Sequence, residues 1–210
     1  MSYKTIIFDF DGTIADTMEE GRRIFNLIAP DHGIKTIDRE QMESLRGFSI
    51  NEFISHMGIP KTKVPIFIAR GTLLMRKSIG GLPLIDGVGD VLRKLRPTVD
   101  RFGILTSNAV ENVEVFLGSH GLRDLFDFVW STSKLTGKSR YLNSARKQFH
   151  LKSEEILYVG DEVRDLKAAK KAGVGSAGVT WGFNSHAALA AENPDHLVDT
   201  PPELLGLAGN

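Results

Sequence analysis

The 210-residue chain contains no cysteine, which excludes disulfides, thiolate zinc sites, iron–sulfur clusters and cysteine nucleophiles. It also lacks net charge, because 26 lysines and arginines balance 26 aspartates and glutamates. A dedicated nucleic-acid binder needs a basic excess to neutralise phosphates, so we expect no nucleic-acid partner. No apolar run approaches the roughly 18 residues of a membrane span, and the first residues do not resemble a secretory signal. We therefore expect a cytoplasmic protein without a membrane partner.

The composition is otherwise that of an ordinary globular protein. Hydrophobic residues make up 41% of the chain and 21 residues are glycine, which is enough apolar material for a real core. The length suits one domain, or one domain with a modest insertion.

Short apolar runs without alternation recur along the chain and predict strands covered on both faces, as in a parallel sheet. These runs are residues 5–8, 102–105, 128–130, 156–159 and 174–179. Helical patterns lie among the later runs, at residues 88–95, 111–117, 140–149 and 163–172. This alternation predicts an α/β protein with a doubly wound parallel sheet.

Residues 16–81 interrupt that alternation with helical patterns alone, at residues 18–28, 38–45, 50–57 and 61–79. The pattern predicts a helical insertion after the first strand, with a core formed by residues 1–15 and 82–210. Several large apolar residues of the insertion are expected to form its own packed core: Phe53, Ile54, Met57, Phe67, Leu74 and Met75.

Polar residues follow three of the predicted strands at the point where each strand ends. Asp9 follows the first strand, Thr106 the second and Asp161 the strand at residues 156–159. In open α/β sheets ligands bind outside the carboxyl ends of the strands, so these groups should converge on one place.

Asp9 and Asp11 are two residues apart, and two close carboxylates need a compensating charge. Hard oxygen ligands without a thiolate favour Mg²⁺, with Asp161 as the third oxygen ligand. A simple Asp-Gly turn at Asp11-Gly12 is the alternative on these residues alone. The convergence of Thr106 and Asp161 on the same point favours a metal site.

Four short motifs, in this order along nearly the whole chain, resemble those of the haloacid dehalogenase-like hydrolases. They are the DFDGTI run at residues 9–14, Thr106 at a strand end, the lone Lys138, and Gly160-Asp161 with Asp165. Residues 158–183 resemble the phosphoglycolate-phosphatase-like branch. The resemblance implies a Rossmann-like core with an α-helical cap, in agreement with the insertion. Ser139 and Glu162 depart from the usual pattern, and Glu162 bears on the metal preference more than on the reaction type.

The resemblance also implies a role for each motif residue. Asp9 would be the nucleophile that forms an aspartyl-phosphate, and Asp11 the general acid and then the general base. Thr106 and Lys138 would act in catalysis and bind the phosphate, with the N–H groups of Ser107 and Asn108 assisting.

Further implied positions surround this centre. Asp9, Asp11 and Asp161 would hold Mg²⁺, with Glu162 and Asp165 next to that shell. Arg46 and Gly47 lie between two predicted helices of the insertion, where Arg46 could bind a second anionic group of the substrate; a surface arginine is the alternative.

The resulting expectation is a Mg²⁺-dependent phosphatase of a small phosphorylated metabolite, with 2-phosphoglycolate as the named candidate, acting as a monomer or homodimer. A sugar-phosphate mutase, a phosphonate hydrolase and a pyrophosphatase share the same core and stay open. Two further alternatives are a non-enzymatic phosphoacceptor and a nucleotide-binding module, the latter because residues 132–139 read TSKLTGKS. That run lacks the first glycine of a phosphate-binding loop.

Overall fold

The computed structural model describes residues 3–132 and 137–207, and its centre is one six-stranded parallel sheet. The strand order is β3-β2-β1-β4-β5-β6. The strands are β1 Thr5–Phe8, β2 Arg101–Thr106, β3 Phe128–Ser131, β4 Ile156–Gly160, β5 Gly175–Val179 and β6 His196–Val198. This arrangement confirms the predicted α/β class and its parallel sheet.

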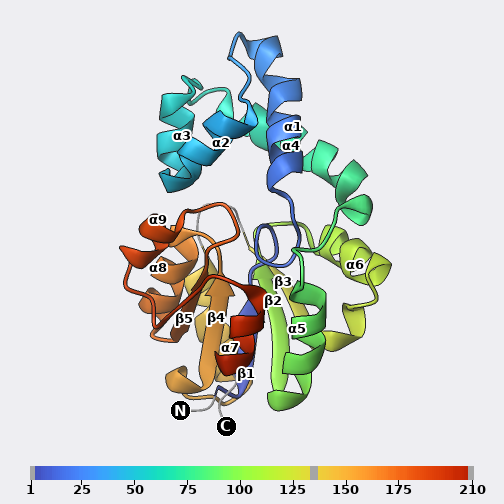
Figure 1. The fold of residues 1–210 in the computed structure, drawn as a ribbon, viewed down its shortest axis with the longest axis vertical. Coiled ribbons are helices and arrows are strands. Elements are labelled where there is room, and N and C mark those ends of the chain that lie inside the picture. The colour runs from blue at the N-terminus through green and yellow to red at the C-terminus, as the bar shows by residue number, and fades with distance from the viewer. Residues whose placement is uncertain (1–2, 133–136, 208–210) are drawn as a thin grey trace.

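Helices cover both faces of the sheet (Figure 1). Helices α5 and α6 pack on one face, and α7 and α8 pack on the other. The helices of this part are α5 Val88–Leu95, α6 Val110–Ser119, α7 Lys138–Gln148, α8 Val163–Ala172 and α9 His186–Ala190. The fold is therefore doubly wound, as the sequence predicted.

The apolar strand sequences follow from this double cover. In β1, Ile6 and Phe8 pack into the cluster beneath α5 and α6, whereas Ile7 packs into the cluster beneath α7 and α8. Successive side chains of a strand point to opposite faces, so a strand buried on both sides reads as a continuous apolar run.

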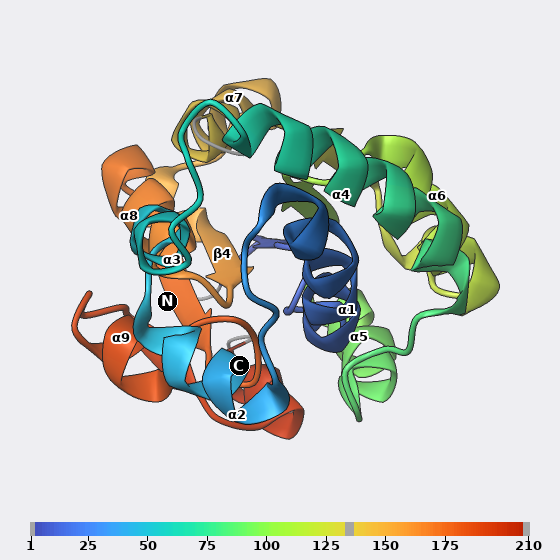
Figure 2. The same ribbon diagram turned by 90° about the horizontal axis from the view of Figure 1, so that it is seen from above.

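Four helices are inserted between β1 and α5, and they stand above the carboxyl ends of the strands (Figure 1). They are α1 Met18–Ile28, α2 Arg39–Ser44, α3 Ile50–His56 and α4 Val64–Ser78. Viewed from above, α1 lies beside α4 (Figure 2). The domain boundaries at residues 15/16 and 81/82 stay a prediction. Within the described ranges, no helix combines the length and apolar character needed to cross a bilayer.

The strand order places a topological switch point between β1 and β4. From β1 the chain runs outward to β2 and β3 on one side, and it returns to β4 on the other side. The crevice outside the carboxyl ends at such a point is where ligands bind in doubly wound sheets. Asp9 follows β1 and Asp161 follows β4, so both lie at this crevice.

Candidate active site

Asp9 is a buried carboxylate held at both oxygens. Its backbone N–H donates to the Val159 carbonyl at 2.8 Å, which extends the β1–β4 ladder by one bond. Its Oδ1 accepts a hydrogen bond from the Phe10 N–H at 2.8 Å, and its Oδ2 lies 2.6 Å from Lys138 Nζ. The carboxylate is therefore fixed in one orientation at the switch point.

Lys138 is the buried first residue of α7 and lies between two carboxylates. Its Nζ is 2.6 Å from Asp9 Oδ2 and 2.6 Å from Asp165 Oδ1. Burial lowers the pKa of Lys138, but the charges of Asp165 and Asp9 outweigh it and hold that pKa above its usual value. The lysine therefore carries a positive charge beside Asp9, where the motif predicts it.

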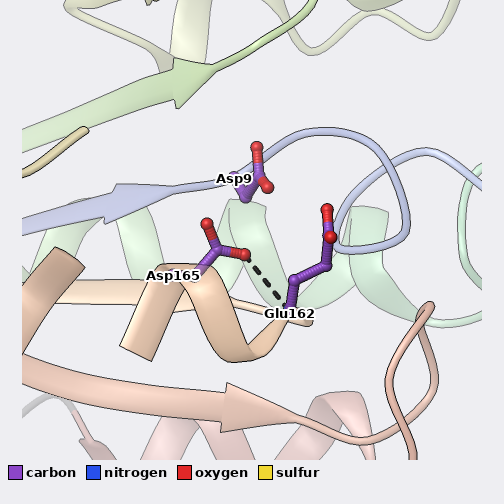
Figure 3. A group of neighbouring side chains, drawn as sticks. All are labelled: Asp9, Glu162 and Asp165. Carbon is purple, nitrogen blue, oxygen red and sulfur yellow. Dashed lines mark hydrogen bonds between the residues drawn. The ribbon is translucent and has the colours of Figure 1, made fainter. Parts of the chain in front are cut away.

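Asp9, Glu162 and Asp165 form a group that could hold a metal ion (Figure 3). One carboxylate oxygen from each lies within 4.8 Å of the others. Asp165 Oδ2 also accepts a hydrogen bond from the Glu162 N–H at 3.1 Å, which ties the start of α8 to the group. The sequence predicted that Glu162 and Asp165 lie next to the metal ligands. In the structure they stand in the same group of possible ligands as Asp9.

Asp161 is fully buried, and its side chain is held by Thr13 and Phe183, two residues to which the sequence analysis gave no role. Its Oδ1 accepts from the Thr13 hydroxyl at 2.7 Å, and its Oδ2 accepts from the Phe183 N–H at 2.7 Å. Asp161 and Asp11 lie outside the group of three, so their metal-binding role stays a prediction. Phe183 ends the stretch at residues 158–183 that resembles the phosphoglycolate-phosphatase-like branch, but its contact with Asp161, 22 residues away along the chain, was not predicted.

The charges around Asp9 leave a surplus of carboxylates among the described residues. Lys138 and Arg164 face four acidic side chains: Asp9, Asp161, Glu162 and Asp165. Burial raises the pKa of Asp9 to about 7 although Lys138 opposes the shift. Burial and the nearby Glu162 also raise the pKa of Asp161 well above its usual value. Such a set of oxygen donors matches the requirements of a divalent cation.

Asp11, Thr106 and Asn108 form a polar edge beside Asp9. Both oxygens of Asp11 lie 3.2 Å from Asn108 Nδ2. The Asn108 N–H donates to Thr106 Oγ1 at 3.0 Å, and the threonine hydroxyl keeps its own proton to donate. The predicted use of the Asn108 N–H for phosphate therefore competes with this bond. Ser107 lines the same cleft as Asp11 and Asn108.

Arg46 and Gly47 lie in the turn Leu45–Gly47 between α2 and α3. Arg46 Nη1 is 2.8 Å from Glu43 Oε1, and Nη2 donates to the Thr180 carbonyl at 2.6 Å. Gly47 is exposed, and an added Cβ would meet nothing within 4 Å. In this structure the guanidinium joins the insertion to the core, so a substrate-selecting role for Arg46 or Gly47 stays a prediction.

Asn184 connects the insertion to the site residues and was not expected from the sequence. Its Nδ2 donates to the Arg46 carbonyl at 2.9 Å, and its Oδ1 accepts from the Val163 N–H at 2.9 Å. Its backbone N–H donates to the Asp161 carbonyl at 3.2 Å. A lone asparagine in a loop carries no recognisable sequence signal, because its partners come from distant segments.

Both the backbone conformation of Gly12 and the atoms around it exclude a larger residue at this position. Its φ is +74°, and an added Cβ would lie 2.3 Å from Asp161 Oδ2. Gly12→Ala should therefore displace Asp161 and destabilise the fold by about 1–3 kcal/mol beyond the cost of the backbone conformation. Gly33→Ala is the matched control, because Gly33 has φ +70° with nothing within 4 Å of an added Cβ. Equal losses in urea unfolding for the two variants would contradict the steric argument.

The comparisons with known proteins agree with this geometry. A family model described as haloacid dehalogenase-like hydrolase matches residues 6–179. A phosphoglycolate phosphatase of Synechococcus elongatus is 36% identical over 202 residues, covering 96% of this chain and 95% of that protein. The pyrophosphatase PpaX of Bacillus cereus (strain B4264) is 27% identical, covering 100% of this chain and 98% of that protein.

Solved structures show the same fold. A haloacid dehalogenase-like family hydrolase from Streptococcus pneumoniae superposes with a TM-score of 0.84 at 21% identity, covering 97% of each chain. With the family model, the relatives and the fold in agreement, the chain belongs to the haloacid dehalogenase-like hydrolases, as a phosphatase of the phosphoglycolate-phosphatase-like branch.

Proposed function

We propose that this phosphatase is Mg²⁺-dependent and hydrolyses a phosphate monoester through an aspartyl-phosphate on Asp9. The observation that carries the proposal is the fixed Asp9 carboxylate at the switch point, paired with Lys138. A carboxylate held in this way is oriented for attack before substrate arrives, and the neighbouring ammonium reduces its repulsion of a phosphate dianion.

The reaction has two balanced steps. First, an Asp9 oxygen forms a bond to phosphorus as the ester P–O bond breaks, and Asp11 gives a proton to the leaving alkoxide. Second, Asp11 takes a proton from water, whose oxygen attacks phosphorus and releases Asp9 and phosphate. The Asn108 amide orients Asp11, and Thr106 donates a hydrogen bond to a phosphoryl oxygen.

The cation would be held by oxygens of Asp9, Glu162 and Asp165, with Asp11 and Asp161 as further predicted ligands. When bound, it supplies positive charge that offsets the negative charge of the phosphoryl oxygens. The surplus of buried carboxylates supports this role, because a divalent cation would neutralise it.

Without metal, stability should fall as pH rises through the titration range of Asp9. Its pKa is near 7 in the fold against about 3.8 unfolded, so the fold holds a proton in that window that the unfolded chain releases. The loss, a few kcal/mol at most, is complete above about pH 7 and is reinforced by Asp161. Thermal unfolding in EDTA from pH 5 to pH 8 measures it, and Mg²⁺ should restore stability most at pH 8. A metal-independent, flat profile would contradict the argument.

The substrate range is tested with a panel of phosphate compounds assayed with and without Mg²⁺. The panel includes 2-phosphoglycolate and pyrophosphate, because the relatives carry the names phosphoglycolate phosphatase and pyrophosphatase. Phosphate release from at least one ester that requires Mg²⁺ and is lost on chelation supports the proposal. Absence of release from every ester would overturn it.

The same assay separates the alternatives. A mutase would yield an isomeric phosphate ester, and a phosphonate hydrolase would cleave a carbon–phosphorus bond. A phosphoacceptor switch would keep its acyl phosphate for minutes, whereas an enzyme with intact Asp11 should lose it within one turnover. The nucleotide-binding alternative falls on residues 132–139, of which residues 133–136 lie outside the described residues. The proposed enzyme acts in the cytoplasm as a monomer or homodimer.

A further inference from the structure

A cavity of about 440 Å³ lies between the inserted helices and the carboxyl ends of the strands. It is continuous with the candidate active site, because Asp11, Ser107 and Glu162 belong to its lining. The part of a substrate that leaves with the ester oxygen therefore has this space available. A volume of this size is in the range of pockets for ligands much larger than glycolate.

The side of the cavity formed by the insertion is apolar. Its lining includes Phe25, Phe53, Ile54, Phe67, Ile68 and Met75. Four of these were expected from the sequence to be packed core. Three of these four residues pack against the small cluster of Ala29, Ile34 and Ile59, and Met75 packs against the core cluster of the sheet. All four nevertheless also line the cavity.

The inserted helices themselves are incompletely packed. No residue of α2, α3 or α4 is fully buried, although all three helices carry large apolar side chains. Apolar surface that faces an open cleft rather than a neighbouring helix gains the hydrophobic free energy only when a ligand covers it.

Two glycines inside helices enlarge the same cavity. Gly21 lies within α1 and Gly71 within α4, and both belong to the lining. An added Cβ at Gly21 would meet nothing within 4 Å, and at Gly71 only Ile24 at 3.9 Å. Close helix packing therefore does not require either glycine, although each costs about 1 kcal/mol relative to alanine. Their effect in this structure is to leave room.

Each arginine of the lining is paired with an acidic side chain, although the buried Nε of Arg46 has no hydrogen-bond partner within the described part of the chain. Arg22 contacts Glu19 and the Ile37 carbonyl. Arg46 contacts Glu43 and the Thr180 carbonyl, and Arg164 contacts Glu162. Among the described lining residues, no lysine is present to take a substrate carboxylate or a second phosphate.

On the basis of the function proposed above, we infer that the preferred substrate is the phosphate monoester of an apolar alcohol larger than glycolate. The phosphate would lie against Asp9 and Lys138, and the alkyl or aryl group would enter the cavity. Each methylene that becomes buried there should raise kcat/KM about three- to fourfold until the cavity is filled.

The test measures kcat/KM for ethyl, butyl, hexyl and octyl phosphate beside 2-phosphoglycolate and pyrophosphate, all with Mg²⁺. We expect a rise with chain length and a larger value for hexyl phosphate than for 2-phosphoglycolate. Hydrolysis that is independent of chain length, or fastest for 2-phosphoglycolate or pyrophosphate, would overturn this inference while the phosphatase function stands. No hydrolysis of any ester would instead overturn the proposed function, and this inference with it.

The second test fills the cavity with a side chain and measures the preference for long alkyl groups. Gly71→Leu places a side chain in the cavity, so the ratio of kcat/KM for hexyl to ethyl phosphate should fall at least about tenfold. Gly118→Leu is the matched control, because Gly118 lies in α6, is exposed and does not border the cavity. Gly71→Ala, which adds one methyl group, should lower the ratio less and also stabilise the helix. An unchanged ratio in a folded Gly71→Leu protein would overturn the inference.

Discussion

Replacing Asp9 by asparagine should lower kcat by about 10⁴-fold or more while the fold stays intact. The amide has the shape of the carboxylate, and its oxygen can still accept from the Phe10 N–H. What it lacks is the nucleophilic oxygen and the charge that faces Lys138. Since Lys138 keeps Asp165 as a partner at 2.6 Å, the buried ammonium stays paired.

Acid-quench trapping measures the intermediate directly. Radiolabelled substrate should leave label on the wild-type protein and none on Asp9→Asn. With an aryl phosphate, whose leaving group needs little help from an acid, Asp11→Asn should accumulate the label, because the second step then lacks its base. Asp90→Asn serves as the control, since Asp90 is exposed on α5. Label on the Asp9→Asn protein would remove Asp9 as the nucleophile.

Lys138→Met should lower kcat/KM by about 10³-fold and also destabilise the protein by about 3–5 kcal/mol near neutral pH. The methionine fills a similar volume but leaves the buried carboxylates of Asp9 and Asp165 without their shared cation. Lys138 lowers the pKa of Asp9, so its loss pushes that pKa further up. The destabilisation should therefore be larger at pH 8 than at pH 5, where the carboxyl group is protonated in the fold.

Urea unfolding at both pH values, without metal, measures this effect. Lys147→Met is the matched control, because Lys147 is an exposed lysine of the same helix. In the double variant with Asp9→Asn, part of the lost stability should return, because one unpaired carboxylate is gone. The same loss for Lys138→Met at pH 5 and pH 8 would contradict a role in charge compensation.

The centre of the sheet could be predicted because strands such as β1 and β4 are buried on both faces. Ile6, Ile7 and Phe8 form a continuous apolar run for that reason, and the pattern is unambiguous beside the helical periods. β6 and α9 were not predicted, since they span only residues 196–198 and 186–190. Elements this short are formed by tertiary contacts rather than by their own patterns.

For the site, the motifs imply part of the observed grouping but not which way the carboxylates turn. Asp9 and Lys138 meet as their motifs imply. The orientation of Asp161 depends on Thr13 and Phe183, and a resemblance that includes Phe183 does not say which side chain its N–H contacts. Glu162, a departure from the family pattern, stands in the metal-capable group with Asp9.

The insertion shows a different limit of sequence reasoning. Phe53, Ile54 and Phe67 have the helical spacing of a packed core, and the structure places them at a cavity. Periodicity identifies the apolar face of a helix but not what covers that face. Whether a neighbouring helix or a ligand lies there depends on how far apart the helices stand, which no local pattern records.

Asn184 has a thermodynamic consequence of its own. The same residue holds the Arg46 carbonyl of the insertion and, through its backbone, the Asp161 carbonyl. A movement of the insertion away from the core would break the bond between Asn184 and Arg46. It would also loosen the loop whose Asn184 N–H donates to the Asp161 carbonyl. Reciprocity then requires that a ligand which favours the first bond through this loop also favours the second bond by an equal factor.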